Sequence, residues 1–207
     1  MRERQVADVG GVVGIVLAAG AGRRYGMPKA LVRGDDGVPW VRRACAALRD
    51  GGADDVVVAL GARADEAARL VPEGVGVARV TGWAQGVGAS LGAALRAVEE
   101  AGAVGGAGAP RWSAAVVTLV DLPELSPAAV RRVVAAAADP PTALCQAGYG
   151  GAPGHPVLIG RAHWGALRAS LAGDVGARVY LEAHGARRVD CTDLGGGDDV
   201  DVPQYRS

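Results

Sequence analysis

The stretch Leu17-Ala-Ala-Gly-Ala-Gly-Arg-Arg-Tyr-Gly-Met-Pro-Lys29 is the most informative part of this chain. The residues that lead into it, 12–18, form a short apolar run that predicts a buried strand ended by glycines. Glycines allow the backbone to turn tightly and to direct successive N–H groups toward an anion. Arg23 and Lys29 can add charge-assisted hydrogen bonds to phosphate oxygens. The pattern therefore predicts a loop that binds a triphosphate; the alternative is an ordinary glycine-rich turn with solvated charges.

Lys29 is the only lysine in the chain, and every other basic residue is an arginine. A chain that uses arginine wherever the two residues serve equally retains lysine where a compact ammonium on a thin stem is needed. Chance is the alternative explanation. The position of this lysine at the end of the glycine-rich loop favours a role in phosphate binding.

The spacing of the loop excludes two other phosphate-binding motifs. A Walker A loop requires Gly-Lys followed by Ser or Thr, whereas Lys29 lies between Pro28 and Ala30. A dinucleotide fingerprint requires GxGxxG, whereas Gly20, Gly22 and Gly26 are spaced GxGxxxG. The second strand of that fold should also end at an acidic residue about 20 residues further on, and here it ends too late, near residue 60. Because Arg63 follows that strand and could bind a 2′-phosphate, an NADP-dependent reductase remains an alternative.

Apolar runs alternate with amphipathic segments along the whole chain. This alternation predicts an α/β fold with a mostly parallel sheet, which binds ligands beyond the carboxyl ends of its strands. The loops 19–29 and 82–88 and the residue Asp121 all follow strands, so we expect them to share one rim of the sheet. The expected strands are 12–18, 55–60, 75–80, 114–120, 142–147, 156–159 and 187–191, and the expected helices are 40–49, 64–70, 89–100, 126–138, 161–171 and 175–184.

Two aspartates are candidate metal ligands. Asp121 comes directly after a buried apolar run, where a carboxylate is well placed to hold Mg²⁺. Asp201 lies in an acidic stretch near the end of the chain. The alternatives are a loop or capping aspartate for the first and a solvated acidic tail for the second. Together the two predict a divalent cation that bridges phosphates.

Composition narrows the class of protein further. The 207 residues carry no formal net charge, which predicts neither nucleic acid nor an anionic membrane as a partner. No stretch approaches the roughly 20 apolar residues that span a bilayer. The three cysteines are scattered, which fits a reducing cytoplasm. We expect residues 1–207 to form one domain with its core between about 12 and 203, since no linker or internal repeat is visible.

These motifs together resemble the MobA-like nucleotidyltransferases, most closely the branch of molybdenum cofactor cytidylyltransferases. The resemblance covers about residues 12–203, and the pattern Leu-Ala-Ala-Gly-x-Gly-x-Arg-x-Gly-x-Pro-Lys is matched in full at residues 17–29. Four further motifs follow in the same order. They are Trp83, Gly86, Ser90 and Leu91; Asp121 and Pro123; Gly154 to Leu158, which reads Gly-His-Pro-Val-Leu; and Gly173 to Arg178, which reads Gly-Asp-Val-Gly-Ala-Arg.

The resemblance implies a three-layer, Rossmann-like nucleotidyltransferase fold with a mixed, mostly parallel sheet. It also implies that the enzyme is Mg²⁺-dependent and joins the nucleotide of a triphosphate to a phosphorylated acceptor, with Arg23, Lys29 and Asp121 as catalytic residues. Asp121 and Asp201 would hold the metal, and His155, Asp174 and Arg178 would face the acceptor. The implied nucleotide-binding residues are Leu17, Ala18, Ala19, Gly20, Gly22, Arg23, Lys29, Gly86 and Ser90.

The resemblance also favours particular substrates. In this family Ala-Ala-Gly goes with CTP and Ala-Gly-Gly with GTP, so Ala18-Ala19-Gly20 favours CTP. Molybdopterin is the implied acceptor, and a molybdoenzyme or a chaperone is an implied partner. The alternatives within the fold are a guanylyltransferase and a sugar-phosphate nucleotidyltransferase.

One departure concerns the tail. The family's Asp-Ile-Asp-Thr-Pro-Glu-Asp is replaced by Asp199-Val-Asp-Val-Pro-Gln-Tyr205, so the final acidic residue is lost. This loss supports an alternative of another class, a nucleotide-binding regulatory module with weak or no catalysis. The absence of a lysine late in the chain argues against the cytidylyltransferases of isoprenoid synthesis.

Overall fold

The computed structural model describes residues 10–103, 110–171 and 173–202, except for the side chain of Asp174. Within them the strands form one seven-stranded sheet in the order β3-β2-β1-β4-β6-β5-β7. Only β6 runs antiparallel to its neighbours, so the sheet is mixed and mostly parallel. The strand bounds are β1 Gly11–Ala18, β2 Asp55–Leu60, β3 Gly76–Arg79, β4 Trp112–Leu119, β5 Leu144–Tyr149, β6 Ala152–Gly160 and β7 Arg187–Asp190.

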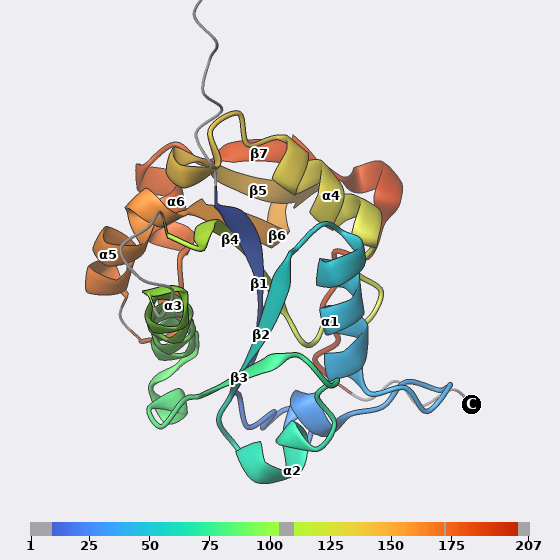
Figure 1. The fold of residues 1–207 in the computed structure, drawn as a ribbon. Helices are drawn as coiled ribbons and strands as arrows, with labels where there is room; N and C mark the ends of the chain where they lie inside the picture. The colour runs from blue at the N-terminus through green and yellow to red at the C-terminus, as the bar shows by residue number, and fades with distance from the viewer. Residues whose placement is uncertain (1–9, 104–109, 172, 203–207) are drawn as a thin grey trace, which may run out of the picture.

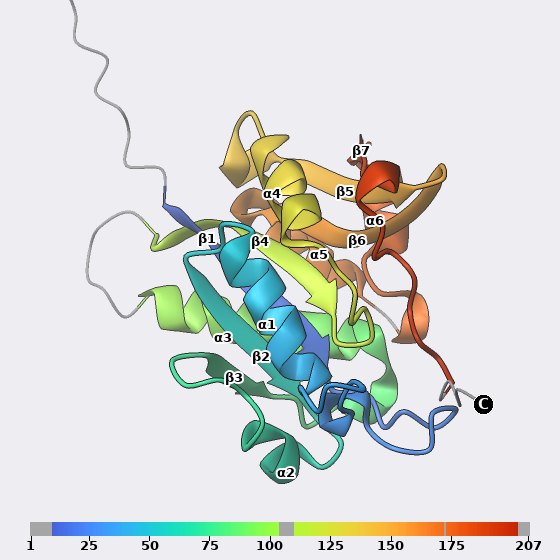
Figure 2. The same cartoon turned by 90° about the vertical axis from the view of Figure 1, so that its right-hand side faces the viewer.

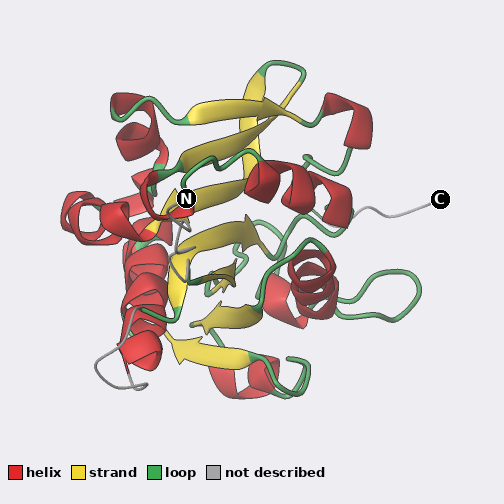
Figure 3. Cartoon of the chain, turned by 45° about the horizontal axis from the view of Figure 1, so that its top comes forward, coloured by secondary structure: helices red, strands yellow, loops and turns green. Residues whose placement is uncertain are grey.

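Helices cover both faces of the sheet, which gives the molecule three layers (Figures 1 and 3). The helices α1 (Trp40–Asp50), α2 (Ala64–Ala68) and α4 (Pro127–Ala135) contribute to the apolar core on one face. The helices α3 (Val87–Ala103), α5 (Arg161–Ser170) and α6 (Arg178–Ala183) contribute to the core on the other face. The predicted three-layer α/β fold is confirmed.

Strand β1 shows why an unbroken apolar run forms the centre of this sheet. Successive side chains of a strand point to opposite faces, so Val16 belongs to the core under α1 while Val13 and Ile15 belong to the core under α3. All three side chains are inaccessible to solvent. Each such burial contributes on the order of 1.5–3 kcal/mol to folding, so a polar residue at any of these positions would be strongly destabilising.

The bounds of several elements differ from the predicted ones. Strand β6 begins four residues before the predicted strand 156–159, and α4 ends three residues before the predicted end at 138. The predicted helix 175–184 is divided into a 3-10 turn, Gly173–Val175, and α6, because Gly176 between them has a positive φ of 57°. Helix α3 begins two residues earlier than predicted and extends to Ala103. Residues 104–109, which follow α3, lie outside the described residues. Ser126 caps α4, since its hydroxyl accepts a hydrogen bond from the N–H of Ala128.

The described helices are all too short or too polar to cross a membrane. The loops beyond the carboxyl ends of β1 and β4 carry charged residues that the sequence predicts to be functional, among them Lys29 and Asp121. Figure 2 shows the loop after β1 and the last described stretch of the chain approaching each other at this rim.

Candidate functional site

The candidate site is a cavity of about 450 Å³ at the carboxyl ends of β1 and β4. Its wall brings together the loop after β1, the segment at the start of α3, the residues after β4 and the C-terminal acidic stretch. The prediction that these segments share one rim is therefore confirmed. The lining residues are Leu17 to Arg24, Lys29, Trp83, Ala84, Gly86, Val87, Ser90, Leu119, Val120, Asp121, Asp199 and Asp201.

The glycine-rich loop folds back on itself at Gly22. This residue has a φ of 60°, and a Cβ atom added to it would lie 1.9 Å from the carbonyl oxygen of Met27. The N–H of Gly26 donates a hydrogen bond of 2.8 Å to the carbonyl oxygen of Gly22, which closes the turn. In contrast, a Cβ atom added to Gly20 would have no other atom within 4 Å and would point into open space. The loop thus leaves room for a ligand beside its first half while its second half returns toward Lys29.

Lys29 joins the loop to the acidic residues on the opposite wall. It begins the 3-10 turn Lys29–Leu31, and its ammonium nitrogen lies 2.8 Å from Oδ2 of Asp121 and 2.8 Å from Oδ1 of Asp201. The side chains of Lys29 and Asp121 are only 13% and 17% exposed, whereas that of Asp201 is 35% exposed. Burial opposes the charge of the ammonium, but the two carboxylates outweigh this effect and raise the pKa of Lys29. The same contact lowers the pKa of Asp201.

Three carboxylates form a group that suits a divalent cation. One oxygen each from Asp121, Asp199 and Asp201 lies within 4.8 Å of the others. Oδ1 of Asp121 is buried and has no hydrogen-bond partner among the described residues, so it is a free acceptor within the group. Hard cations prefer such an all-oxygen set. The N–H of Val200 donates to the carbonyl oxygen of Asp121 at 3.0 Å, which holds the acidic stretch against the end of β4.

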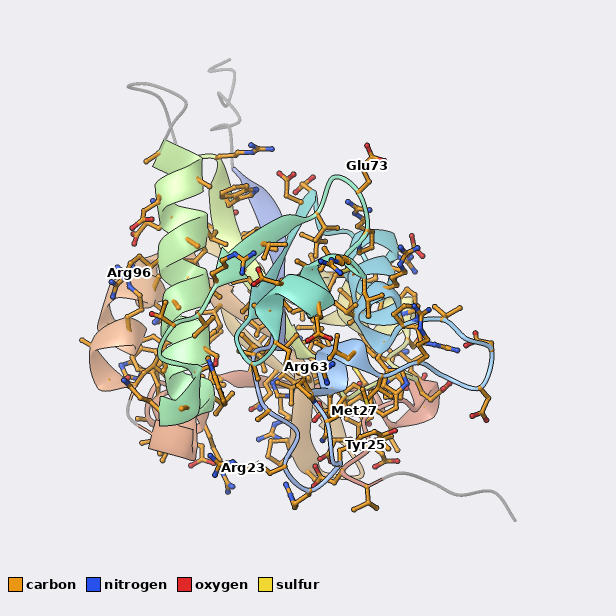
Figure 4. The ribbon with its side chains drawn as sticks, turned by 90° about the horizontal axis from the view of Figure 1, so that it is seen from below. Arg23, Tyr25, Met27, Arg63, Glu73 and Arg96 are labelled. Atoms are coloured by element: carbon orange, nitrogen blue, oxygen red, sulfur yellow. The ribbon has the colours of Figure 1, made fainter. Side chains whose placement is uncertain are left out.

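The two arginines of the loop lie differently. Arg24 forms an ion pair of 2.8 Å with Oδ2 of Asp201, although its side chain is 78% exposed. Arg23 also lines the cavity, and Figure 4 shows it on the side of the loop toward α3, away from Tyr25 and Met27. Arg23 was predicted from the sequence to bind phosphate, whereas Arg24 had no predicted role. The signal was available, because the arginine of the Leu-Ala-Ala-Gly-x-Gly-x-Arg pattern falls on residue 24.

The segment at the start of α3 supplies the uncharged part of the wall. Gly86 has a φ of 109° and precedes the helix, and the hydroxyl of Ser90 donates to its carbonyl oxygen at 3.3 Å. Gly86 and Ser90 both line the cavity, as do the predicted residues of the first loop. Trp83 and Asp199 also line the cavity. From the sequence, Trp83 could either cover a base or simply pack, whereas Asp199 had no predicted site role although it begins the tail motif.

Of the predicted acceptor residues, Arg178 and His155 do not line the cavity. Arg178 is exposed at the start of α6 and pairs with Glu182 at 3.0 Å, and it does not line the cavity. The side chain of Asp174 lies outside the described residues. His155 lies in the first half of β6. Removal of its ring from water lowers its pKa to about 4, although the charges of Asp121 and Asp199 act to raise that pKa. His155 is thus close enough to the acidic group to interact with it electrostatically.

The depressed pKa of His155 predicts a pH-dependent stability. The folded protein holds the ring neutral down to about pH 4, whereas the unfolded chain takes up the proton near pH 6.5. Unfolding is therefore favoured as the pH falls from 6.5 toward 4, by about 2–3 kcal/mol in total. The free energy of unfolding can be measured by urea titration at each pH in a chelating buffer. We expect His155→Asn to lack the part of its decrease at low pH that comes from His155. An equal decline in both proteins would show that other groups cause it.

Known proteins resemble this chain over almost its whole length. Nicotine blue oxidoreductase from Paenarthrobacter nicotinovorans is 33% identical over 206 residues, which cover 94% of each protein. The crystal structure of Rv0371c from Mycobacterium tuberculosis H37Rv superposes with a TM-score of 0.72 at 28% identity and covers 94% of each chain. A complex of Rv0371c with manganese gives a TM-score of 0.68 at 27% identity over 93% of this chain and 91% of that chain.

A nucleotidyl transferase from Methanothermobacter thermautotroptrophicus shares the fold, with a TM-score of 0.71 at 22% identity over 93% of this chain and 92% of that chain. The family model that matches this chain is described as the MobA-like NTP transferase domain and matches residues 14–189. That range includes the glycine-rich loop, Lys29 and Asp121. The chain therefore belongs to the MobA-like NTP transferase family.

Proposed function

We propose that this protein transfers cytidine monophosphate from CTP to a phosphorylated small molecule and releases pyrophosphate. The observation that carries the proposal is the meeting of Lys29 with Asp121 and Asp201 beside a glycine-rich loop, in a cavity large enough for a nucleotide. Ligand cavities of about 300–1,000 Å³ are typical of small-molecule sites. The cavity is lined by Arg23, Arg24 and Lys29 and also by uncharged residues from the start of α3, a combination that suits a nucleotide.

The reaction is an in-line displacement. An oxygen of the acceptor phosphate attacks the α-phosphorus while the bond between that phosphorus and its bridging oxygen breaks, and pyrophosphate leaves. The protein supplies no covalent nucleophile, so its contribution is positioning and neutralisation of charge. A lysine ammonium has three donors. Because Asp121 and Asp201 accept two of them, the third is free for a phosphate oxygen, and the carboxylates hold the ammonium in place.

Charge balance explains why a cation should accompany the nucleotide. Arg23, Arg24 and Lys29 are matched by the three carboxylates of Asp121, Asp199 and Asp201, so the wall by itself has no excess of positive charge for a triphosphate. The three carboxylates would hold Mg²⁺, and the free Oδ1 of Asp121 supports this assignment. Bound Mg²⁺ supplies neutralisation of the charge that develops on the phosphates and the leaving pyrophosphate.

The preference for CTP is assigned to Ala19. Its side chain is 3% exposed, and the residue lines the cavity beside the uncharged wall. The methyl group narrows the space for a base, so a purine should fit less well than a pyrimidine. We expect Ala19→Gly to shift the ratio of kcat/KM for GTP over CTP upward by about tenfold, the size of effect that one methyl group has in a pocket. Steady-state pyrophosphate release with each nucleotide measures it, and an unchanged ratio would remove Ala19 from the account.

Molybdopterin is the acceptor that the family resemblance favours, and a molybdoenzyme or its chaperone is the corresponding partner for the product. Both are proposals, as are the cytoplasmic location and the roles of His155, Asp174 and Arg178 in binding the acceptor. His155 receives support from its electrostatic interaction with Asp121 and Asp199. The exposed position of Arg178 favours contact with an acceptor that extends beyond the cavity.

A second candidate function is oxidation and reduction, because one relative at 33% identity is a nicotine blue oxidoreductase. The residue that favoured NADP in the sequence, Arg63, does not line the cavity and pairs instead with Glu66. Figure 4 shows Arg63 away from the loop segment that bears Arg23. Because Arg63 lies outside the lining of the cavity and is paired with Glu66, it gives no support to NADP binding there, which favours nucleotidyltransfer.

Thermal unfolding with a panel of ligands separates these functions. A ligand that binds only the folded state raises the Tm by mass action. We expect a Mg²⁺-dependent rise that is largest with CTP, followed by pyrophosphate release when molybdopterin is added. A rise with CTP but no release with any phosphorylated acceptor would favour the regulatory module. A rise with NADPH and with none of CTP, GTP, ATP and UTP would refute the proposal and favour a reductase.

A further inference from the structure

Trp83 differs from the other three tryptophans of the chain in its exposure. Trp40, Trp112 and Trp164 are 6%, 3% and 0% exposed and belong to the core. Trp83 is half-buried and lines the candidate cavity. Its indole N–H makes no hydrogen bond to any residue that the structure describes, whereas the N–H groups of Trp112 and Trp164 each have an acceptor.

The backbone around Trp83 holds its side chain in one place. A Cβ atom added to Gly61 would lie 2.5 Å from Cβ of Trp83 and 2.6 Å from the carbonyl oxygen of Ala19, so Gly61 is packed between the two. The N–H of Ala62 donates to that same carbonyl oxygen at 3.0 Å. Trp83 itself begins a short 3-10 turn that is closed by a hydrogen bond of 3.2 Å from Gly86. The indole is therefore fixed relative to the glycine-rich loop.

The lining residues that come from the second loop and the start of α3 carry no charge; they are Trp83, Ala84, Gly86, Val87 and Ser90. The charged lining residues are Arg23, Arg24, Lys29 and the three aspartates, and the contacts among them join Arg24 and Lys29 to Asp201. The aromatic face of Trp83 can stack on any nucleobase, because every base has a π-face.

We propose that Trp83 is a substrate-binding residue whose indole ring stacks on the nucleobase of the substrate. This inference rests on the proposed function, since it assigns the base to the uncharged lining residues of the same cavity. Trp83 also packs against the apolar core under α3, so a purely structural role is the competing explanation. The structural role accounts for the buried part of the ring but not for its exposed edge in the cavity.

Intrinsic fluorescence provides a direct test, because Trp83 is the tryptophan of the four that a cavity ligand can reach. We expect CTP with Mg²⁺ to quench the emission of the wild-type protein, and Trp83→Phe to lose this response. Equilibrium dialysis should show that Trp83→Phe still binds CTP, since the phenyl ring also stacks. Trp83→Ala should raise the Kd and the KM for CTP by at least tenfold and change kcat less than threefold. Gln85→Ala, an exposed neighbour that does not line the cavity, is the matched control and should leave all three values unchanged.

Two negative results have different meanings. Dialysis that finds CTP bound to the wild-type protein, with unchanged fluorescence and an unchanged Kd in Trp83→Ala, would overturn the role of Trp83 and leave the proposed function intact. Dialysis that finds no CTP bound would overturn the proposed function and this inference together. If Trp83→Ala does not fold, the dialysis and fluorescence of Trp83→Phe decide between a binding role and a packing role.

Discussion

Replacement of Lys29 by alanine should lower kcat by about 10²- to 10³-fold, because the loss of one preorganised donor to a developing charge has an effect of this size. The contact that makes Lys29 a strong candidate is its position 2.8 Å from two carboxylates at once. These contacts hold the ammonium against the glycine-rich loop and leave one donor for a phosphate. The KM for CTP should rise less than kcat falls, since the ammonium is expected to interact most strongly when charge develops on the bridging oxygen. Pyrophosphate release followed over a range of CTP concentrations, up to saturation, measures both values.

The same variant should also be less stable. Without the ammonium, the carboxylate of Asp121, which is 17% exposed, loses its cationic partner beside a second carboxylate. Leaving a buried polar group unpaired costs about 1–3 kcal/mol, and Mg²⁺ should restore part of this loss by binding the acidic group. Arg33→Ala is a suitable control, because Arg33 is exposed and lies on the same segment but does not line the cavity. Turnover by Lys29→Ala at the wild-type rate would refute the assigned role.

The sequence predicted the fold well because its strands are encoded by composition rather than by periodicity. A fully buried central strand such as β1 is an unbroken apolar run, and the loops at its carboxyl end are marked by glycine and by the single lysine. The common rim followed from the rule that parallel strands present their carboxyl ends to one edge. The bounds of the short helices were harder to predict. The positive φ of Gly176 interrupts the predicted helix 175–184, but the hydrophobic pattern around Gly176 does not change.

Contacts between distant segments were less accessible from the sequence. Nothing in the sequence indicated that Lys29 would pair with the metal-ligand candidates themselves, because Lys29 and Asp201 are 172 residues apart. Arg24 was missed although the arginine of the family pattern falls on it, and its ion pair with Asp201 now places it at the site. From the sequence, Trp83 could either cover a base or simply pack, and only the structure shows that it lines the cavity. Long-range pairing depends on how loops of variable conformation meet, which local patterns do not determine.

Replacement of Asp121 by asparagine should abolish metal-dependent turnover while it preserves the shape of the side chain. Asp121 contributes the buried Oδ1, which has no partner among the described residues, as well as the oxygen that contacts Lys29. Asparagine keeps one oxygen but removes the negative charge, so it should weaken both the cation site and the attachment of Lys29. We expect kcat to fall by about 10³-fold, somewhat more than for loss of a single donor.

Metal binding to the free protein gives a readout that does not depend on catalysis. Mn²⁺ titrated into the wild-type protein should bind at the acidic group, and Asp121→Asn should weaken that binding at least tenfold. Asp198→Asn is the matched control, because Asp198 is an exposed neighbour of the acidic stretch that does not belong to the group of three. Equal Mn²⁺ affinity in Asp121→Asn and wild type would exclude Asp121 as a ligand even if turnover were lost. In that case Asp121 would act by orienting Lys29, and the Lys29→Ala and Asp121→Asn effects on kcat should then fail to add in the double variant.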